Sequence, residues 1–267
     1  GDNALVFTKQ DVLPEGKVSY SHITHIFQVE DGTIFYHRFF TAPKTLFVKW
    51  NGKEIEVALP EENRFFGAQG NGVYFDVELM NGHSSIYRAT FSPEKEEVTV
   101  CKVRDMLPYE VARYGGMCSM KRDGKTLVHR MSDDPLQDGV LVDVADAKLE
   151  ELALTGMHRG KAIYTRVNPD LHHPSARMLC KNAILVELIS TDFQFRSIAF
   201  DSLPFVYFSD GNHLFSLDTE TLEFLPALSF GIEVIGLGGI HDGVLTVLSK
   251  REEGNCLATA RLPDGYF

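Results

Sequence analysis

The chain has 267 residues and a formal net charge of −11; 44% of its residues are hydrophobic and 24% are charged. This is the balance of an ordinary globular protein, and it excludes a largely disordered chain. The negative charge disfavours nucleic acid and anionic membranes as partners, and no apolar stretch approaches the ~20 residues of a membrane-spanning helix.

The four cysteines lie inside apolar, strand-like runs, and none forms a metal-ligand spacing; they are Cys101, Cys118, Cys180 and Cys256. We therefore expect free thiols, no metal and no cofactor. The chain has no signal-peptide pattern and no Asn-x-Ser/Thr sequon, so an intracellular location, cytoplasmic or nuclear, is expected. It begins with Gly1 rather than Met, which is compatible with a domain of a longer protein.

Alternating apolar residues predict strands along the whole chain. The first run, residues 4–9, precedes the first complete repeat and is expected to pair with the last sheet and close it. Pairs of strands joined by short polar turns follow at 45–50 and 54–59, 85–91 and 98–103, 140–144 and 149–154, and 213–217 and 222–225. A short helix is expected only around 108–113.

Tight turns recur with a long period. Asp-Gly or Asn-Gly pairs begin at Asp31, Asn71, Asp123, Asp210 and Asp242, and such pairs supply the positive φ angles that hairpins require. Their average spacing of about 42 residues, with one degenerate turn, matches the ~40–50 residues of a propeller blade. The sequence thus predicts an all-β fold, a single β-propeller over residues 1–267 with about six blades of mostly four antiparallel strands.

The expected blades run over about 23–60, 64–104, 115–155, 160–200, 202–228 and 232–263. The stretch from Gly160 to Phe230 allows two assignments of strands and a blade of only three. Residues 214–226 resemble the outer half of a kelch-type or WD40-type blade, and Gly115-Gly116 and Gly238-Gly239 are similar to the double glycine of kelch repeats. The resemblance is to the propeller superfamily and implies its ring architecture.

Arginines recur in the loops that lead into successive inner strands. The loops contain Arg64-Phe65, Arg113-Tyr114 and His158-Arg159, and Tyr20 and His22 occupy the corresponding place before the first blade. If these loops line one mouth of the channel, three guanidinium groups converge there, and arginine suits bidentate recognition of carboxylate or phosphate. The alternative is that each arginine pairs with a nearby acid and stabilises its loop.

The expected function is a non-catalytic interaction module, an adaptor or scaffold that binds an acidic or phosphorylated segment of another protein at this mouth. The expected inner strands, at 25–29, 65–69, 117–120, 162–167 and 234–240, are apolar, which argues against a central calcium site. A propeller hydrolase or isomerase acting on a small anionic substrate stays open as an alternative, with His158 and Glu110 or Asp105 as its acid–base pair. A rigid segment of a larger complex is the third possibility.

Overall fold

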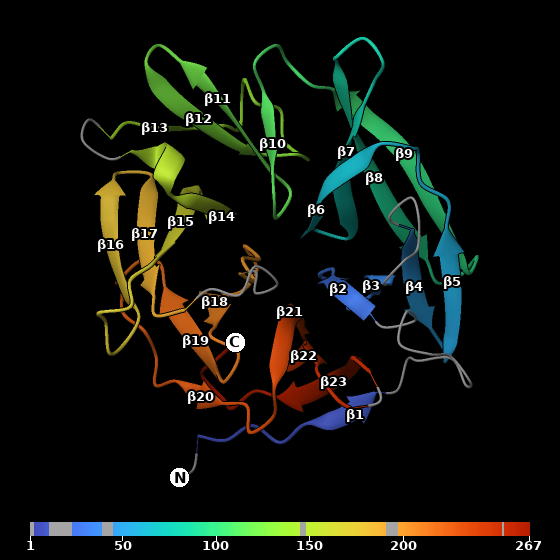
Figure 1. The fold of residues 1–267 in the computed structure, drawn as a ribbon, viewed down its shortest axis with the longest axis vertical. Coiled ribbons are helices and arrows are strands. Elements are labelled where there is room, and N and C mark those ends of the chain that lie inside the picture. Colours follow the sequence, from blue (N-terminus) through green and yellow to red (C-terminus); the bar gives the residue numbers. More distant parts are fainter. Residues whose placement is uncertain (1–2, 11–22, 39–44, 145–147, 191–196, 253) are drawn as a thin grey trace.

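The strands form six sheets arranged as blades around a ring (Figure 1). This computed structural model describes residues 3–10, 23–38, 45–144, 148–190, 197–252 and 254–267. Apart from a single 3₁₀ turn at Leu149–Glu151, the regular structure of these residues is all strand. The expected all-β propeller of about six blades is confirmed.

The first three blades each contain four antiparallel strands in sequence order. Blade one is β2 (Ile23–Gln28), β3 (Ile34–Arg38), β4 (Leu46–Trp50) and β5 (Lys53–Val57). Blade two is β6 (Asn63–Gln69), β7 (Gly72–Glu78), β8 (Ser84–Ser92) and β9 (Glu97–Asp105). Blade three is β10 (Val111–Arg113), β11 (Met117–Arg122), β12 (Lys125–Arg130) and β13 (Val140–Val142).

The other three blades are less regular. Blade four is β14 (Ala153–His158), β15 (Lys161–Val167), β17 (Ala183–Leu188) and β16 (Ser175–Cys180) in that spatial order, and β15 and β17 run parallel. Blade five has the three strands β18 (Phe205–Ser209), β19 (His213–Asp218) and β20 (Leu228–Ser229). Blade six is β21 (Val234–His241), β22 (Val244–Ser249), β23 (Cys256–Arg261) and β1 (Thr8–Gln10).

The ring is closed by strands from the two ends of the chain. β1 pairs antiparallel with β23, and Thr8 lies opposite Thr259. Just before β1, the backbone N–H of Leu5 donates to the carbonyl oxygen of Ser229 at 2.8 Å. The expected closure of the last blade by the N-terminal strand is therefore confirmed, although the paired segment starts later than residue 4.

The boundary between blades three and four differs from the expected one. Residues 111–113, expected to be helical, form the inner strand β10, and residues 149–154, expected to be an outer strand of blade three, form the 3₁₀ turn and the start of β14. The expected inner strands at 117–120 and 162–167 are thus second strands, β11 and β15. Alternation identified these segments as strands, but it carries no information on which blade a strand joins.

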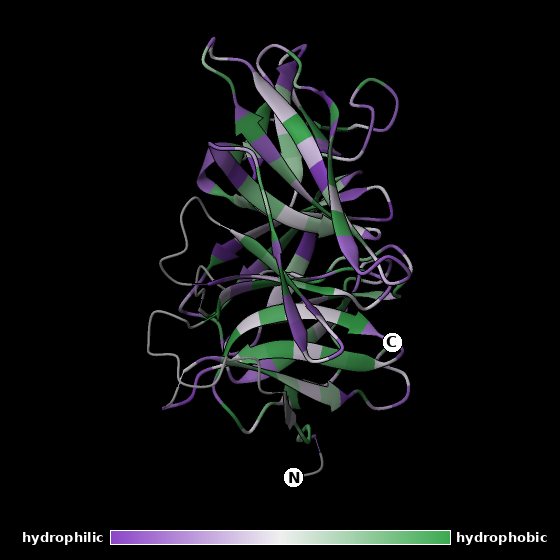
Figure 2. Ribbon diagram, turned by 90° about the vertical axis from the view of Figure 1, so that its right-hand side faces the viewer, coloured by the Kyte–Doolittle hydropathy of each residue, from purple (hydrophilic) through white to green (hydrophobic). Residues whose placement is uncertain are grey.

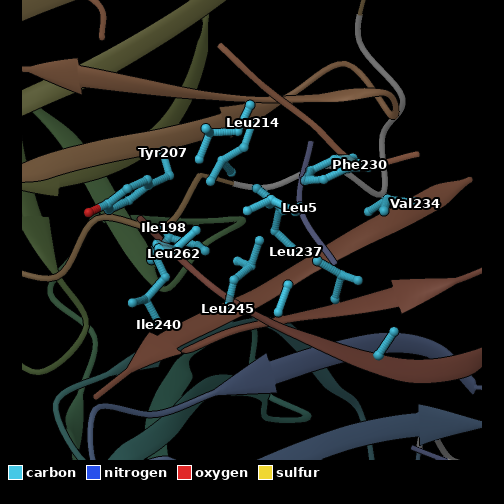
Figure 3. Close-up of a cluster of buried hydrophobic side chains, with 14 of the residues drawn as sticks. Leu5, Ile198, Tyr207, Leu214, Phe230, Val234, Leu237, Ile240, Leu245 and Leu262 are labelled. Carbon is cyan, nitrogen blue, oxygen red and sulfur yellow. The ribbon is translucent and has the colours of Figure 1, made fainter. Parts of the chain in front are cut away.

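The hydrophobic core is divided among the interfaces between blades. Blades five and six share a cluster in which Tyr207 and Leu214 pack with Leu237 and Leu245 (Figure 3). Blades one and two share another, with Phe27 and Val48 facing Phe75. Apolar residues follow the strands and polar residues gather toward the loops (Figure 2). Each buried Leu or Phe contributes about 1.5–3 kcal/mol relative to exposure, so the contacts between blades hold the ring together.

Within the described residues, helix is confined to that single short turn. None of the helices in the described ranges is long and apolar enough to cross a membrane.

Candidate functional site

A cavity of about 660 Å³ in the described residues lies between blades three and four. We call it the blade 3–4 pocket. Its walls come from β10, β11, β12, the 3₁₀ turn, β14 and β15, and His25 of β2 reaches it from blade one. They include the apolar side chains of Met120, Leu152 and Leu154. The cavity is large enough for an amino-acid side chain and part of its backbone, since pockets for small ligands measure about 300–1,000 Å³.

Arg113 supplies a positive charge to the wall of this pocket. Its Nε donates a hydrogen bond to the hydroxyl oxygen of Ser119 at 3.1 Å, which orients the guanidinium. Among the described residues no acidic group pairs with Arg113. Its terminal nitrogens therefore keep their capacity to bind an anion in the bidentate geometry that arginine favours.

The other charged groups of the pocket neutralise each other. The ammonium of Lys121 lies 3.3 Å from a carboxylate oxygen of Glu150 and 3.1 Å from the hydroxyl of Thr126. On the inner wall, burial raises the pKa of Tyr164 to about 12, so its phenol is neutral and able to donate a hydrogen bond. Among the Lys, Arg, Asp and Glu residues that line the pocket, Arg113 is the one without an ion pair to another lining residue, and His25 of β2 also lines it.

Aromatic residues surround the opening of the pocket. Tyr109 is 91% exposed and Tyr114 is 63% exposed. The ring of Phe65 meets the ring of Tyr114 edge-on, with centroids 4.9 Å apart. Phe65 reaches this position from a β-bulge in β6, where its φ is 53°, and bulges of this kind re-aim side chains near functional sites.

Arg64 lies next to this aromatic group but has a structural partner. Its guanidinium lies 5.6 Å from the centre of the Phe65 ring. Its Nε donates to a carboxylate oxygen of Asp76 at 2.7 Å, and one terminal nitrogen donates to Glu78 at 3.0 Å. Asp76 is fully buried, so Arg64 compensates a buried charge, which matches the alternative considered for the arginines.

Arg64 lies near the start of the inner strand β6, whereas Arg159 follows the end of the inner strand β14. The two arginines therefore lie at opposite ends of the channel. It occupies the tight turn that follows the inner strand β14, and its backbone N–H donates to Asp201 at 2.7 Å. Asp201 lines a second cavity of about 440 Å³, which the β6–β7 turn at Gly70 also lines. The structure thus brings Arg64, Phe65, Arg113 and Tyr114 together and places Arg159 elsewhere.

His158 is fully buried beneath the same turn. One ring nitrogen lies 2.9 Å from the hydroxyl of Thr219 and the other lies 2.9 Å from the carbonyl oxygen of Leu203. Burial lowers the pKa of His158, which favours the neutral ring. Tyr20 and His22 lie outside the described residues.

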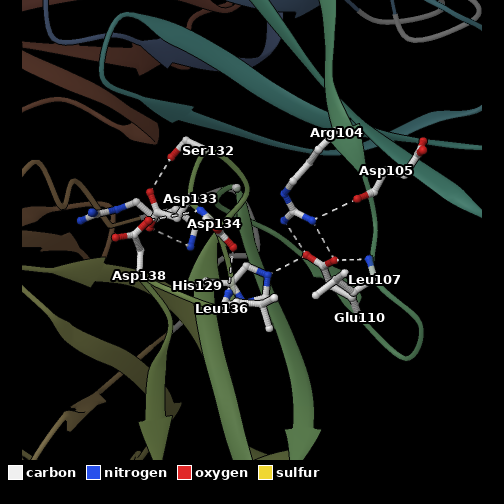
Figure 4. Close-up of polar contacts among 12 residues, drawn as sticks. Arg104, Asp105, Leu107, Glu110, His129, Ser132, Asp133, Asp134, Leu136 and Asp138 are labelled. Carbon is white, nitrogen blue, oxygen red and sulfur yellow. Dashed lines mark hydrogen bonds and ion pairs between the residues drawn. The ribbon is translucent and has the colours of Figure 1, made fainter.

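The carboxylates considered as partners for His158 are engaged elsewhere, and Figure 4 shows the contacts of Glu110. Glu110 accepts hydrogen bonds from two nitrogens of Arg104, at 2.7 and 2.9 Å, and lies 2.6 Å from Nε2 of His129. Asp105 accepts a hydrogen bond from Ser85 at 2.8 Å. The described contacts of His158 include neither carboxylate, so the expected acid–base pair is not assembled in this structure.

One set of potential metal ligands clusters in the described part of the chain. The ligand atoms of Glu110, Cys118 and His129 all lie within 4.8 Å of one another, and all three side chains are buried. The Glu110 carboxylate already accepts from Arg104, from His129 and from the backbone N–H of Leu107. The guanidinium beside it opposes a cation, so these residues form a structural ion network rather than a well-suited metal site.

Several pocket residues were not identified from the sequence. Tyr109, Lys121, Glu150 and Tyr164 line the pocket, yet they lie in four different segments that only the packing of two blades brings together. The pair Pro108-Tyr109 could have drawn attention to Tyr109. Proline often occupies the second position of a tight turn, and the third position of such a turn favours glycine. A tyrosine in place of the glycine indicates a turn whose side chain is exposed to solvent.

The ring of blades is similar to several solved structures. The PQQ-bound aldose sugar dehydrogenase from Streptomyces coelicolor is 10% identical with a TM-score of 0.47, and the match covers 97% of this chain and 98% of that chain. The RRP9 WD40 repeats are 10% identical with a TM-score of 0.47, over 95% and 97% of the two chains. YCF48 from Cyanidioschyzon merolae is 10% identical with a TM-score of 0.39, over 97% and 99%. No protein-family model and no curated protein sequence matches the chain.

Proposed function

We propose that the chain is a non-catalytic protein-interaction module that binds an acidic or phosphorylated segment of a partner protein in the blade 3–4 pocket. The observation that carries this proposal is Arg113, a guanidinium fixed by Ser119 in the wall of an apolar cavity, with no acidic partner among the described residues. Arg64 and Arg104 contrast with it, because acids of the fold already neutralise both.

The surroundings of Arg113 favour a protein segment as its ligand. The rim residue Tyr114 and its neighbour Phe65 offer flat apolar surface next to the charge, and arginine and tyrosine are enriched among residues that dominate interface energies. The net charge of −11 repels acidic partners in general. Binding of an acidic segment therefore depends on local contacts at this pocket.

A selection from a displayed library of random dodecapeptides tests the proposal. We expect the immobilised protein to enrich peptides that contain acidic residues, and Arg113→Ala to lose at least about tenfold in affinity for them, as expected for a charge-assisted pair worth about 1.5–3 kcal/mol. Arg177→Ala is the matched control, because Arg177 is an exposed arginine on the outer strand β16.

The expected result is enrichment by the wild-type protein and by Arg177→Ala, with loss in Arg113→Ala. Failure to enrich any peptide family, or equal affinity of the selected peptides for all three proteins, would overturn the proposal.

A further inference from the structure

Tyr109 has a backbone conformation that its residue type disfavours. Its φ is 65°, in the left-handed region, and it follows Pro108 in a turn closed by the Glu110 N–H donating to the Leu107 carbonyl at 3.1 Å. This turn position favours glycine, because a Cβ there is crowded by the backbone. Since the side chain is 91% exposed at the pocket lip, packing within the fold does not explain a tyrosine there.

A second aromatic residue, which contacts the rim but does not line the pocket, shows the same feature. Phe65 has a φ of 53° at the bulge of β6 and contacts Tyr114. Residues held in such conformations cluster at binding sites, where the surrounding structure enforces them. Two strained aromatic residues beside one apolar pocket indicate that the rim is built to contact a flat apolar group.

The charged side chains of the pocket restrict which anion a ligand can carry next to its flat apolar group. Lys121 and Glu150 pair with each other, so Arg113 is the one arginine or lysine of the lining that is left to bind an anion. A phosphate carries about −1.5 to −2 charges and three acceptor oxygens, so a single guanidinium compensates it poorly. A carboxylate carries one charge and matches the two free ends of the guanidinium.

We infer that the partner segment inserts a large aromatic side chain at the rim formed by Tyr109 and Tyr114 and places an adjacent carboxylate on Arg113. This inference rests on the proposed function and specifies the chemistry of the same site. It selects the carboxylate over the phosphate as the recognised anion and makes Tyr109 a specificity-determining residue.

Four blocked hexapeptides test the ligand chemistry. Each carries Gly-Ser at one end and Ser-Gly at the other, and the central pair is Trp-Glu, Trp-Gln, Ala-Glu or Trp-phosphoserine. Binding is followed by NMR chemical-shift titration to millimolar peptide. We expect Trp-Glu to bind at least fivefold more tightly than each of the other three. No binding by Trp-Glu, or equal or tighter binding by Trp-phosphoserine or Ala-Glu, overturns the inference.

Two variants separate the role of the ring from any effect on the fold. Tyr109→Gly removes the strain and the ring together, so its unfolding midpoint is expected to stay equal or rise while its affinity for the Trp-Glu peptide falls at least fivefold. Glu96→Gly is the matched control, because Glu96 has a φ of 51° and is exposed in the β8–β9 turn. It is expected to gain similarly in stability and to keep its affinity.

The outcomes distinguish the two proposals. Unchanged affinity in Tyr109→Gly, with binding still lost in Arg113→Ala, overturns the inference on the aromatic rim and leaves the acidic-segment site standing. Unchanged affinity in both variants overturns the site itself.

Discussion

Arg64 and Arg113 show how two similar residues acquire different roles from their neighbours. Both were expected to bind a partner. Arg64 lies against the fully buried carboxylate of Asp76, whereas Arg113 faces a cavity and is held by a hydroxyl group. The sequence shows that arginines recur at similar spacing, but the identity of the partner depends on contacts between strands.

This difference predicts different costs for the two alanine variants. Arg64→Ala leaves the charge of Asp76 buried without compensation, so we expect it to lower the free energy of unfolding by about 3 kcal/mol. Arg113→Ala removes an exposed side chain and is expected to change it by less than about 0.5 kcal/mol. Urea denaturation measures both, and equal losses for the two variants would contradict these assigned roles.

The contacts of Glu110 lead to a second prediction, which concerns how the free energy of unfolding depends on pH. Burial by itself raises the pKa of Glu110, but hydrogen bonds from Arg104, His129 and the Leu107 N–H outweigh it and hold the pKa well below its ordinary value. Because the pKa is lower in the folded state, the stabilisation is present above the unfolded pKa of about 4.3 and is lost as the pH falls through the folded value.

We therefore expect Glu110→Gln to be less stable than the wild type by about 3 kcal/mol at pH 5. The difference in free energy of unfolding between the two proteins should be smaller at pH 3, because the wild type has then lost part of the stabilisation from Glu110. Denaturant titrations at the two pH values measure it. A gap that is absent at pH 5, or that widens at pH 3, would show that Glu110 contributes no charge-dependent stability.

At the scale of elements, blades two and three meet at two glycines. A Cβ placed on Gly67 would collide with the backbone of Gly115, because the inner strand β6 and the β10–β11 turn approach each other there. This contact positions Tyr114 against Phe65. The close approach of these backbones thus helps to build the pocket rim.

We expect Gly67→Ala to cost about 3 kcal/mol in the free energy of unfolding, since the obstruction is backbone and has little room to yield. Gly156→Ala is a milder comparison, because its Cβ would lie 3.2 Å from the side chain of Ala199. Thermal unfolding of both variants checks the ranking, and the reverse order would mean that the two blades do not pack as described.

Hairpins were predictable from the sequence, whereas blade membership was not. The Asp123-Gly124 turn is a tight hairpin with φ of 52° and 77°, as its composition indicated. The inner strand β10 has only three residues, too few for a detectable alternation, so the run at 108–113 that contains it was expected to be a short helix. The tight turn at Arg159-Gly160 lies within blade four, between β14 and β15, rather than between blades.

At the scale of the molecule, the ring depends on its closure by the N-terminal segment. Leu5 is 8% exposed and belongs to the cluster shared by blades five and six, whereas its neighbour Val6 is 84% exposed. We expect Leu5→Ala to lower the free energy of unfolding by about 2–3 kcal/mol and Val6→Ala by less than about 0.5 kcal/mol. Similar values from denaturant titration would imply that this segment does not close the ring.

The propeller as a whole was predictable because a period of about 42 residues survives variation in single strands. The pocket was not, because it forms between two blades whose facing residues come from segments about 40 residues apart, and the packing of blades sets their alignment. Arg113 and Tyr114 were identified from their spacing, while Tyr109 and the apolar walls required the structure.

The central claim is that an acidic partner segment binds between blades three and four. Hydrogen–deuterium exchange, with and without the tightest peptide from the library, tests it most directly. We expect the peptide to slow exchange in residues 109–115 and 149–155, which carry the walls of the blade 3–4 pocket. Slowed exchange instead at 70–72 and 199–202, which line the second cavity, would contradict the account.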